Sequence, residues 1–402
     1  KPELLNFTNP GLLRGIFQEY IQAGAQILCA NTFGANALKL AGTGYTVDQT
    51  VSAAVAAARE AAAGTGVKVS LDLGPLGELL EPLGTLSFER AYEYFKEVAI
   101  AGERAGADLV SIETMTDLYE AKAALLAVKE NTSLPVLVTM SFEQTGRTFT
   151  GCTIPSMART LEGLGADAVG LNCSLGPDLL LPLLQELCRN TRLPVIAKPN
   201  AGLPDPATGA YGMGPEEFAA ALLPCLEAGV TIFGGCCGTS PEYIRALVKA
   251  LEGKIPAPRT YRSTGFVCSA MAPCFLDGVR VIGERINPTG KKRLQQALLD
   301  QDLDYVLDLA VQQEDAGADI LDVNVGYPGV DEAALLPTVV KKLQSAVPLP
   351  LQLDSTDPAA LEAALRVYNG KAAVNSVNGE PSVLERILPI VKKYGASVVG
   401  LC

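Results

Sequence analysis

The chain has 402 residues, of which 48% are hydrophobic and 19% are charged. This composition is typical of a packed globular protein and excludes an intrinsically disordered chain. The net charge of -12 argues against a nucleic-acid partner, because surfaces that bind phosphate backbones need clustered Lys and Arg. No apolar run approaches the length of a membrane span, so we expect no membrane partner. Ten cysteines without the dense spacing of small secreted scaffolds indicate reduced thiols and a cytoplasmic protein.

A sequence pattern that consists of a helix end, a glycine and a short apolar strand recurs along the first 250 residues. Glycine at a helix C-cap followed by a β-branched apolar run is typical of the loop between a helix and a strand. The predicted strands are continuously apolar, as expected when both faces of a parallel sheet are buried. They cover residues 27–33, 67–73, 107–114, 135–142, 166–173, 194–200 and 230–237.

Seven such β/α units are one fewer than a closed TIM-type barrel contains, so we expect the first barrel to lack its N-terminal strand. A second series of five strands is too short to close, which predicts a second barrel truncated at its C-terminus. The predicted fold class is therefore α/β, with two TIM-type (β/α)8 barrels in tandem. The second series comprises 279–286, 318–325, 349–354, 372–377 and 396–401.

The predicted domain boundaries follow from the composition between the two series. Residues 253–276 carry Pro, Ser and Thr without a clear period and are expected to form the interdomain linker. This places the first barrel at 1–252 and the second, partial barrel at 277–402.

Three cysteines stand where predicted strands end: Cys173 after ADAVGLN, and Cys236 with Cys237 after VTIFGG. Strand ends on one face of a barrel are where catalytic groups gather. Three thiolates could bind zinc and leave its fourth position open, as in a catalytic site. The chain has no histidine, so such a site would use sulfur and oxygen ligands only. The alternative is that these cysteines are small buried apolar residues.

Six motifs stand out in the first 250 residues: FTNP (7–10), ANTFGAN (30–36), IETMTDLYEAK (112–122), LNCSLGP (171–177), KPNAG (198–202) and GGCCGT (234–239). With these motifs the segment resembles the zinc-dependent homocysteine methyltransferases. The resemblance implies that Cys173, Cys236 and Cys237 ligate zinc and that the homocysteine sulfur takes the open position. The zinc-bound substrate thiolate is then the nucleophile, and no protein residue needs to act as a catalytic base.

The same resemblance implies a set of residues around homocysteine. Glu113 would receive the substrate amino group, although an exposed carboxylate at a strand end is the alternative for this residue. Asn200 would approach the metal when substrate is absent. Gly74 fits a backbone cradle for the substrate carboxylate. Asn172 and Ser174, on either side of Cys173, complete the expected homocysteine-binding set.

Carboxylates and amides lie at or just beyond successive strand ends in the second half. Such groups can hydrogen-bond a flat heterocycle, although Asp and Asn at loop starts often serve as caps or turn formers. The segments that carry these groups are GERINPTG (283–290), ILDVNVG (320–326), LQLDS (351–355) and AVNSVNG (373–379). They resemble the pterin-binding family, in particular the folate half of cobalamin-dependent methionine synthases. The resemblance implies that Asp354 and Asn375 hold the pterin ring, with Asn324 and Glu284 nearby. The full predicted set is Glu284, Asn287, Asp322, Asn324, Asp354 and Asn375.

Together the two resemblances imply a methyltransferase that passes methyl from 5-methyltetrahydrofolate through cobalamin to zinc-activated homocysteine, giving methionine and tetrahydrofolate. The family binds cobalamin through a histidine, which this chain lacks, so we expect cobalamin on a module or protein outside it. One alternative is a zinc-dependent homocysteine S-methyltransferase with another methyl donor. The other is a non-catalytic, zinc-stabilised binding protein.

Overall fold

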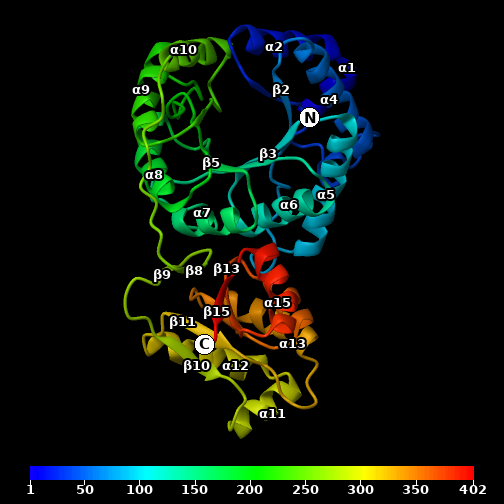
Figure 1. Ribbon diagram of the computed structural model, residues 1–402. Coiled ribbons are helices and arrows are strands. Elements are labelled where there is room, and N and C mark those ends of the chain that lie inside the picture. The colour runs from blue at the N-terminus through cyan, green and yellow to red at the C-terminus, as the bar shows by residue number, and fades with distance from the viewer. The chain divides into compact units, whose positions relative to one another are not determined.

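The computed structural model describes residues 1–402 and divides the chain into two compact units (Figure 1). The first unit contains Lys1–Thr150 and Ala166–Tyr261, and the second contains Gly151–Gly165 and Arg262–Cys402. None of the helices combines the length and the apolar character needed to cross a membrane.

The first unit is built on a curved sheet of seven parallel strands that pair in chain order. The seven strands predicted from the sequence are all present, although most are shorter than predicted. Because all strands run the same way, their carboxyl ends meet at one edge of the sheet, where functional groups are expected. The strands are β1 (Ile27–Cys29), β2 (Lys68–Leu73), β3 (Leu109–Met115), β4 (Val136–Met140), β5 (Ala168–Asn172), β6 (Val195–Lys198) and β7 (Ile232–Phe233).

Helices connect these strands and cover the outer face of the curved sheet (Figure 1). Their ends follow local chemistry: Thr46 and Gln49 form a capping box at α4, and Gly106 closes α5 in the left-handed conformation. The elements of this unit are the short 3-10 helix η1 (Pro2–Leu4), α1 (Leu5–Thr8), α2 (Pro10–Gln22), α3 (Ala37–Leu40), α4 (Val47–Ala62), α5 (Phe88–Ala105), α6 (Leu118–Asn131), α8 (Pro177–Asn190), α9 (Pro215–Glu227) and α10 (Pro241–Leu251).

The second unit contains a sheet of five parallel strands in the order β10-β11-β12-β14-β15. All five strands of the second predicted series are present. They are β10 (Ile282–Ile286), β11 (Ile320–Val323), β12 (Leu351–Asp354), β14 (Ala373–Val377) and β15 (Ser397–Gly400). The helices of this unit are α7 (Ile154–Gly163), α11 (Lys292–Asp300), α12 (Leu303–Asp315), α13 (Glu332–Gln344), α14 (Pro358–Val367) and α15 (Pro381–Tyr394).

The segment 253–276, which composition assigned to a linker, is not irregular throughout. It contains β8 (Phe266–Ser269) and β9 (Pro273–Phe275), which form an antiparallel sheet with β13 (Gly370–Lys371). The residues of β8 are buried, because they pack within the second unit. No helix that ends in glycine leads directly into these two strands, so the pattern that predicted the parallel strands did not detect them. Helix α7 also groups with this unit, because it contacts β8 and β13.

A buried carboxylate gives the first unit a pH-dependent stability. Glu120 on α6 is 4% exposed, and its Oε1 accepts a hydrogen bond of 2.7 Å from the Leu76 N–H. Burial raises the pKa of Glu120 to about 7, well above that of an unfolded glutamate. The folded state therefore holds the proton more tightly, and its stability falls as pH rises from the unfolded pKa to the folded one.

We expect Glu120→Gln, which keeps the acceptor oxygen without the charge, to stabilise the first unit at pH 8 by up to about 3 kcal/mol. At pH 4 the two proteins should differ little, since both carry a neutral side chain. Urea unfolding at the two pH values measures this difference. Glu78→Gln, at an exposed position, is the matched control. An equal effect of E120Q at both pH values would contradict the assignment.

Candidate metal centre

The segments that follow β5 and β7 bring three cysteine thiols together at the carboxyl edge of the first sheet. Strand β5 ends at Asn172, and Cys173 and Ser174 then take left-handed backbone angles, with φ of 62° and 57°. Such angles are uncommon for residues other than glycine and are typical of functional sites. The Sγ atoms of Cys173, Cys236 and Cys237 all lie within 4.8 Å of one another.

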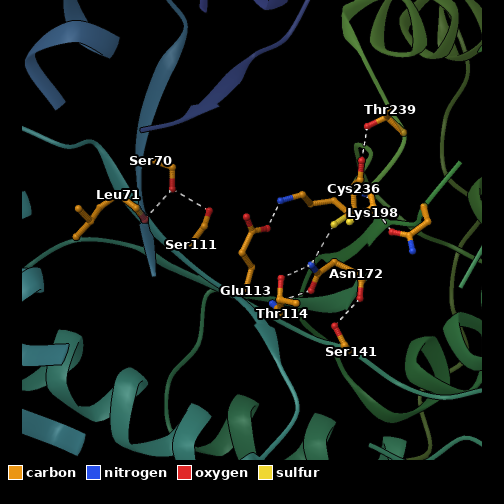
Figure 2. Close-up of polar contacts among 12 residues, drawn as sticks. Ser70, Leu71, Ser111, Glu113, Thr114, Ser141, Asn172, Lys198, Cys236 and Thr239 are labelled. Carbon is orange, nitrogen blue, oxygen red and sulfur yellow. Dashed lines mark hydrogen bonds and ion pairs between the residues drawn. The ribbon is translucent and has the colours of Figure 1, made fainter. Parts of the chain in front are cut away.

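Adjacent residues of a regular strand point to opposite faces, so Cys236 and Cys237 converge only because the chain leaves extended geometry there. Two glycines make this possible. A Cβ at Gly235 would lie 2.5 Å from Thr239 Oγ1, and Gly238 has a φ of 80°. The turn is held by the Thr239 hydroxyl, which donates to the Cys236 carbonyl at 2.7 Å (Figure 2).

Asn200 contacts the same centre from the segment after β6 (Val195–Lys198). Its side chain is 4% exposed, and its Oδ1 accepts a hydrogen bond of 3.1 Å from the Cys237 N–H. Its side chain also hydrogen-bonds the Cys173 sulfur. The Cys236 N–H donates to the Pro199 carbonyl at 2.8 Å, so the KPNAG segment holds both cysteines in place.

Contacts among the three thiols shift their pKa values in opposite directions. Hydrogen bonding from Cys236 lowers the pKa of Cys173 to about 5, against the opposing effect of burial. The pKa of Cys236 is raised because it donates this hydrogen bond and is partly buried. Burial and the nearby Cys173 charge raise the pKa of Cys237. A bound divalent cation would lower the pKa values of all three thiols and leave them ionised.

The donor set and its spacing fit a zinc ion. Soft thiolates favour zinc, and tetrahedral ligands at about 2.3 Å from the metal lie about 3.8 Å from each other. The Cys173 and Cys237 sulfurs are 3.7 Å apart. No protein nitrogen ligand competes for the fourth position, because the chain contains no histidine.

Glu113 and Thr114 lie at an irregular position of β3, near the three cysteines. The register between β3 and β4 shifts between Ile112 and Met115, and Thr114 has a φ of 63°. Asn172 accepts from the Thr114 N–H at 2.9 Å and donates to the Thr114 hydroxyl at 2.8 Å. Its amide nitrogen also lies 3.9 Å from the Cys236 sulfur (Figure 2). Asn172 therefore links the end of β3 to the cysteines.

Glu113 is not an exposed carboxylate, which was the alternative considered from sequence. Its side chain is 14% exposed and forms an ion pair with Lys198, the last residue of β6 (Figure 2). Lys198 belongs to the KPNAG motif, and no role was predicted for it from the sequence. A cation at the end of an otherwise apolar buried strand was the signal that could have identified it.

Two other predicted homocysteine-binding residues differ from expectation in detail. The Gly74 N–H already donates to the Phe33 carbonyl at 3.0 Å, so it is not a free donor for a carboxylate. A Cβ at Gly74 would lie 2.5 Å from the Phe33 ring, which explains the glycine by packing. Ser174 is exposed, and its backbone hydrogen-bonds the Cys173 sulfur.

Four of the residues predicted to bind pterin come together at the strand ends of the second unit. Asn324 donates to Asp354 Oδ2 at 2.9 Å, and Asp354 is paired in register with Asn375 of the neighbouring strand. Asp322 accepts from Gln352 at 2.6 Å and also hydrogen-bonds Asn375. Burial raises the pKa of Asp322. The result is a connected set of amide and carboxylate groups.

The remaining two residues of that set have local partners. Glu284 forms an ion pair of 3.2 Å with Lys291 and contributes negative charge near Asp322. Asn287 accepts a hydrogen bond of 3.0 Å from the Thr289 N–H, which is the turn-forming role considered from sequence.

Two known protein families match this chain, one in each unit. Residues 1–251 match the protein family described as homocysteine S-methyltransferase. The chain belongs to this family. Residues 283–401 match the family described as pterin binding enzyme, so both family resemblances seen in the sequence are confirmed.

Some relatives of this chain are much longer proteins. The methionine synthase of Mycobacterium tuberculosis (strain ATCC 25618 / H37Rv) is 35% identical over 424 residues, covering 99% of this chain and 35% of that protein. The methionine synthase of Mycobacterium leprae (strain TN) is 34% identical over 429 residues, with 99% and 35% coverage. The chain thus spans about a third of the length of these relatives.

Solved structures show the same fold for the first unit. The oxidised form of the homocysteine methyltransferase MmuM from Escherichia coli aligns with a TM-score of 0.54 and 24% identity, covering 61% of this chain and 86% of that chain. The metallated form of the same protein gives a TM-score of 0.53 over 60% of this chain and 85% of that one.

Proposed function

We propose that this chain forms the homocysteine- and folate-binding part of an enzyme that transfers methyl from 5-methyltetrahydrofolate through cobalamin to homocysteine. The products are methionine and tetrahydrofolate. The observation that carries the proposal is the convergence of Cys173, Cys236 and Cys237 within 4.8 Å, in a chain of the homocysteine S-methyltransferase family. Cobalamin would be bound outside this chain, in the same protein or in a partner.

In this proposal the three cysteines hold zinc, which as a Lewis acid would keep a coordinated substrate thiol ionised at neutral pH. Glu113 accepts the substrate ammonium group from the adjacent strand end. Asn172 fixes the Thr114 turn against Cys236, and Asn200 fixes the Cys237 backbone. These residues orient the substrate, and none of them needs to act as a base.

The second unit is proposed to present the folate. The match of residues 283–401 to pterin binding enzymes supports this role. Asp354 and Asn375 would hydrogen-bond the donor and acceptor edge of the pterin, with Asn324 and Asp322 supporting them. A homocysteine methyltransferase with another methyl donor would have no use for this second site.

The proposal also covers the barrel architecture of the two units. We propose that each parallel sheet is part of a TIM-type (β/α)8 barrel, with the first in 1–252 and the second in 277–402. Residues 253–276 would connect them, with β8 and β9 as local structure. All ten cysteines are free, which supports a cytoplasmic protein.

The decisive experiment is to measure zinc stoichiometry and the zinc X-ray absorption spectrum under reducing conditions, with and without L-homocysteine. One zinc with three sulfur ligands, rising to four sulfurs with homocysteine, is the expected result. Four protein ligands that ignore homocysteine would instead indicate a structural zinc site, as in the non-catalytic alternative. Absence of zinc from the purified chain would contradict the proposal.

A further inference from the structure

A loop between β6 and α9, residues 203–211, folds back on itself and ends at Tyr211. Pro204 and Tyr211 pair as an antiparallel bridge. Asp205 closes the turn, because its Oδ1 accepts hydrogen bonds of 2.9 Å and 2.8 Å from the N–H groups of Ala207 and Thr208. The residues before Tyr211 are all exposed. The loop therefore takes its shape from its own hydrogen bonds rather than from burial.

Both ends of the loop are attached beside the metal centre. The Ala201 N–H donates to the Cys237 carbonyl at 2.9 Å, and the Met213 N–H donates to the Ala201 carbonyl at 3.4 Å. The Tyr243 hydroxyl, from α10, donates to the Met213 carbonyl at 2.6 Å. These bonds join the two ends of the loop to each other and to the backbone of Cys237.

The side chain of Tyr211 lies against the turn that carries Cys237. A Cβ at Gly238 would lie 2.4 Å from the Tyr211 ring, so the ring occupies the space that a side chain at Gly238 would need. The Tyr211 hydroxyl donates a hydrogen bond to the Cys237 sulfur. The packing of the ring and the bond of the hydroxyl thus bring Tyr211 to one particular cysteine.

Cys237 is the most accessible cysteine of the metal centre, since Cys173 and Cys236 are both partly buried and Cys237 is exposed. A thiolate is a nucleophile, so an electrophilic methyl donor meets the Cys237 sulfur as well as the substrate sulfur. In this side reaction a sulfur lone pair forms the S–C bond, and the leaving group departs from the methyl carbon with its bonding electrons. The product is a neutral thioether, which binds zinc more weakly than a thiolate does.

Hydrogen-bond donors distinguish the cysteine sulfurs from an incoming substrate sulfur. A donor stabilises a thiolate in its charged state, and this stabilisation is lost as the sulfur becomes a neutral thioether, so the reaction is slower. Each cysteine sulfur has such a donor from the protein: the Ser174 backbone and Asn200 at Cys173, Asn172 at Cys236, and Tyr211 at Cys237. At the exposed sulfur, this protection depends on the hydroxyl at the end of loop 203–211.

We propose that Tyr211 is a positioning residue that acts through Cys237: its hydrogen bond suppresses methylation of the Cys237 sulfur and leaves the substrate sulfur as the acceptor. The proposal rests on the proposed function and goes beyond it, because it explains which sulfur at the centre receives the methyl group.

The test measures how fast methyl iodide methylates Cys237 in the zinc-loaded chain without homocysteine, with the modified residue identified by peptide mass spectrometry. Tyr211→Phe keeps the ring against Gly238 and removes the hydroxyl. We expect Cys237 to react about tenfold faster in Y211F, as loss of one hydrogen bond to a charged group predicts. Methylation of Cys173 and the zinc content should stay the same. Tyr45→Phe, at an exposed tyrosine, is the matched control.

The cobalt(II)-substituted chain provides a second measurement. The sulfur-to-cobalt charge-transfer band should move to longer wavelength in Y211F, because a thiolate that has lost a hydrogen bond gives up an electron more easily. A merely structural role of Tyr211 would lower the metal content without this shift.

Equal methylation of Cys237 in Y211F and wild type, or an unshifted cobalt spectrum, would overturn the role of Tyr211. So would faster methylation of all three cysteines together with loss of zinc, which would indicate a disrupted site. A zinc-loaded chain that binds no homocysteine would contradict the proposed function alone, since this test uses no homocysteine. A chain that binds no zinc would contradict both.

Discussion

Replacement of Cys236 by serine is expected to abolish zinc binding at stoichiometric metal and to lower homocysteine methylation more than about a hundredfold. Serine is a much weaker zinc ligand than a thiolate, and a two-cysteine site cannot hold the metal tightly. Cys236 is the most informative of the three cysteines, because its sulfur also contacts Asn172. In the proposed site, this substitution therefore disturbs the metal and the Asn172 contact together.

Zinc per chain, measured by mass spectrometry, and methylation of homocysteine by added free methylcobalamin report the two effects separately. Cys402→Ser, at an exposed cysteine of the second unit, is the matched control and should behave as wild type. Retention of one tightly bound zinc in C236S, with unchanged methylation, would show that the triad is not the metal site.

Replacement of Asp354 by alanine is expected to weaken methyltetrahydrofolate binding by about a hundredfold or more while zinc content stays unchanged. Asp354 is the acceptor for Asn324 and lies in register with Asn375, so its loss removes a proposed pterin contact and leaves the partly buried Asn324 amide without this partner. Sites built to hydrogen-bond a ligand lose most of their affinity when such a group is left unpaired.

Direct titration with methyltetrahydrofolate measures this effect, and L-homocysteine binding checks the first unit independently. Asp308→Ala is the matched control, because Asp308 is exposed on α12 and is not one of the predicted pterin residues. Equal folate affinity of D354A and wild type would remove the second unit from the proposed reaction.

The strands could be predicted because their signals are local. A glycine that ends a helix and an apolar run that follows it, as at Gly106 and β3 (Leu109–Met115), are set by the residues themselves and their immediate neighbours. The position of Cys173 at a strand end followed in the same way. The convergence of Cys173 with Cys236 could be anticipated because parallel strands bring their carboxyl ends to one edge.

Other features had no local signal. The strands β8 and β9 are three or four residues long, and they exist because β13, about a hundred residues later in the chain, pairs with β8. The N–H of Gly74 donates to the Phe33 carbonyl, a backbone hydrogen bond between segments about forty residues apart that the glycine itself does not disclose. Composition therefore indicated a linker where the folded chain has strand pairing.

The sequence by itself determined the order of strands, the strand-end positions of the cysteines and the family resemblance, because these depend on residues close together in the chain. Only the tertiary structure decided which charges meet. Lys198 and Glu113 are 85 residues apart, and curvature of the sheet brings them together with Asp72. Burial then sets the chemistry of this cluster, since a carboxylate removed from water must find a partner or lose its charge.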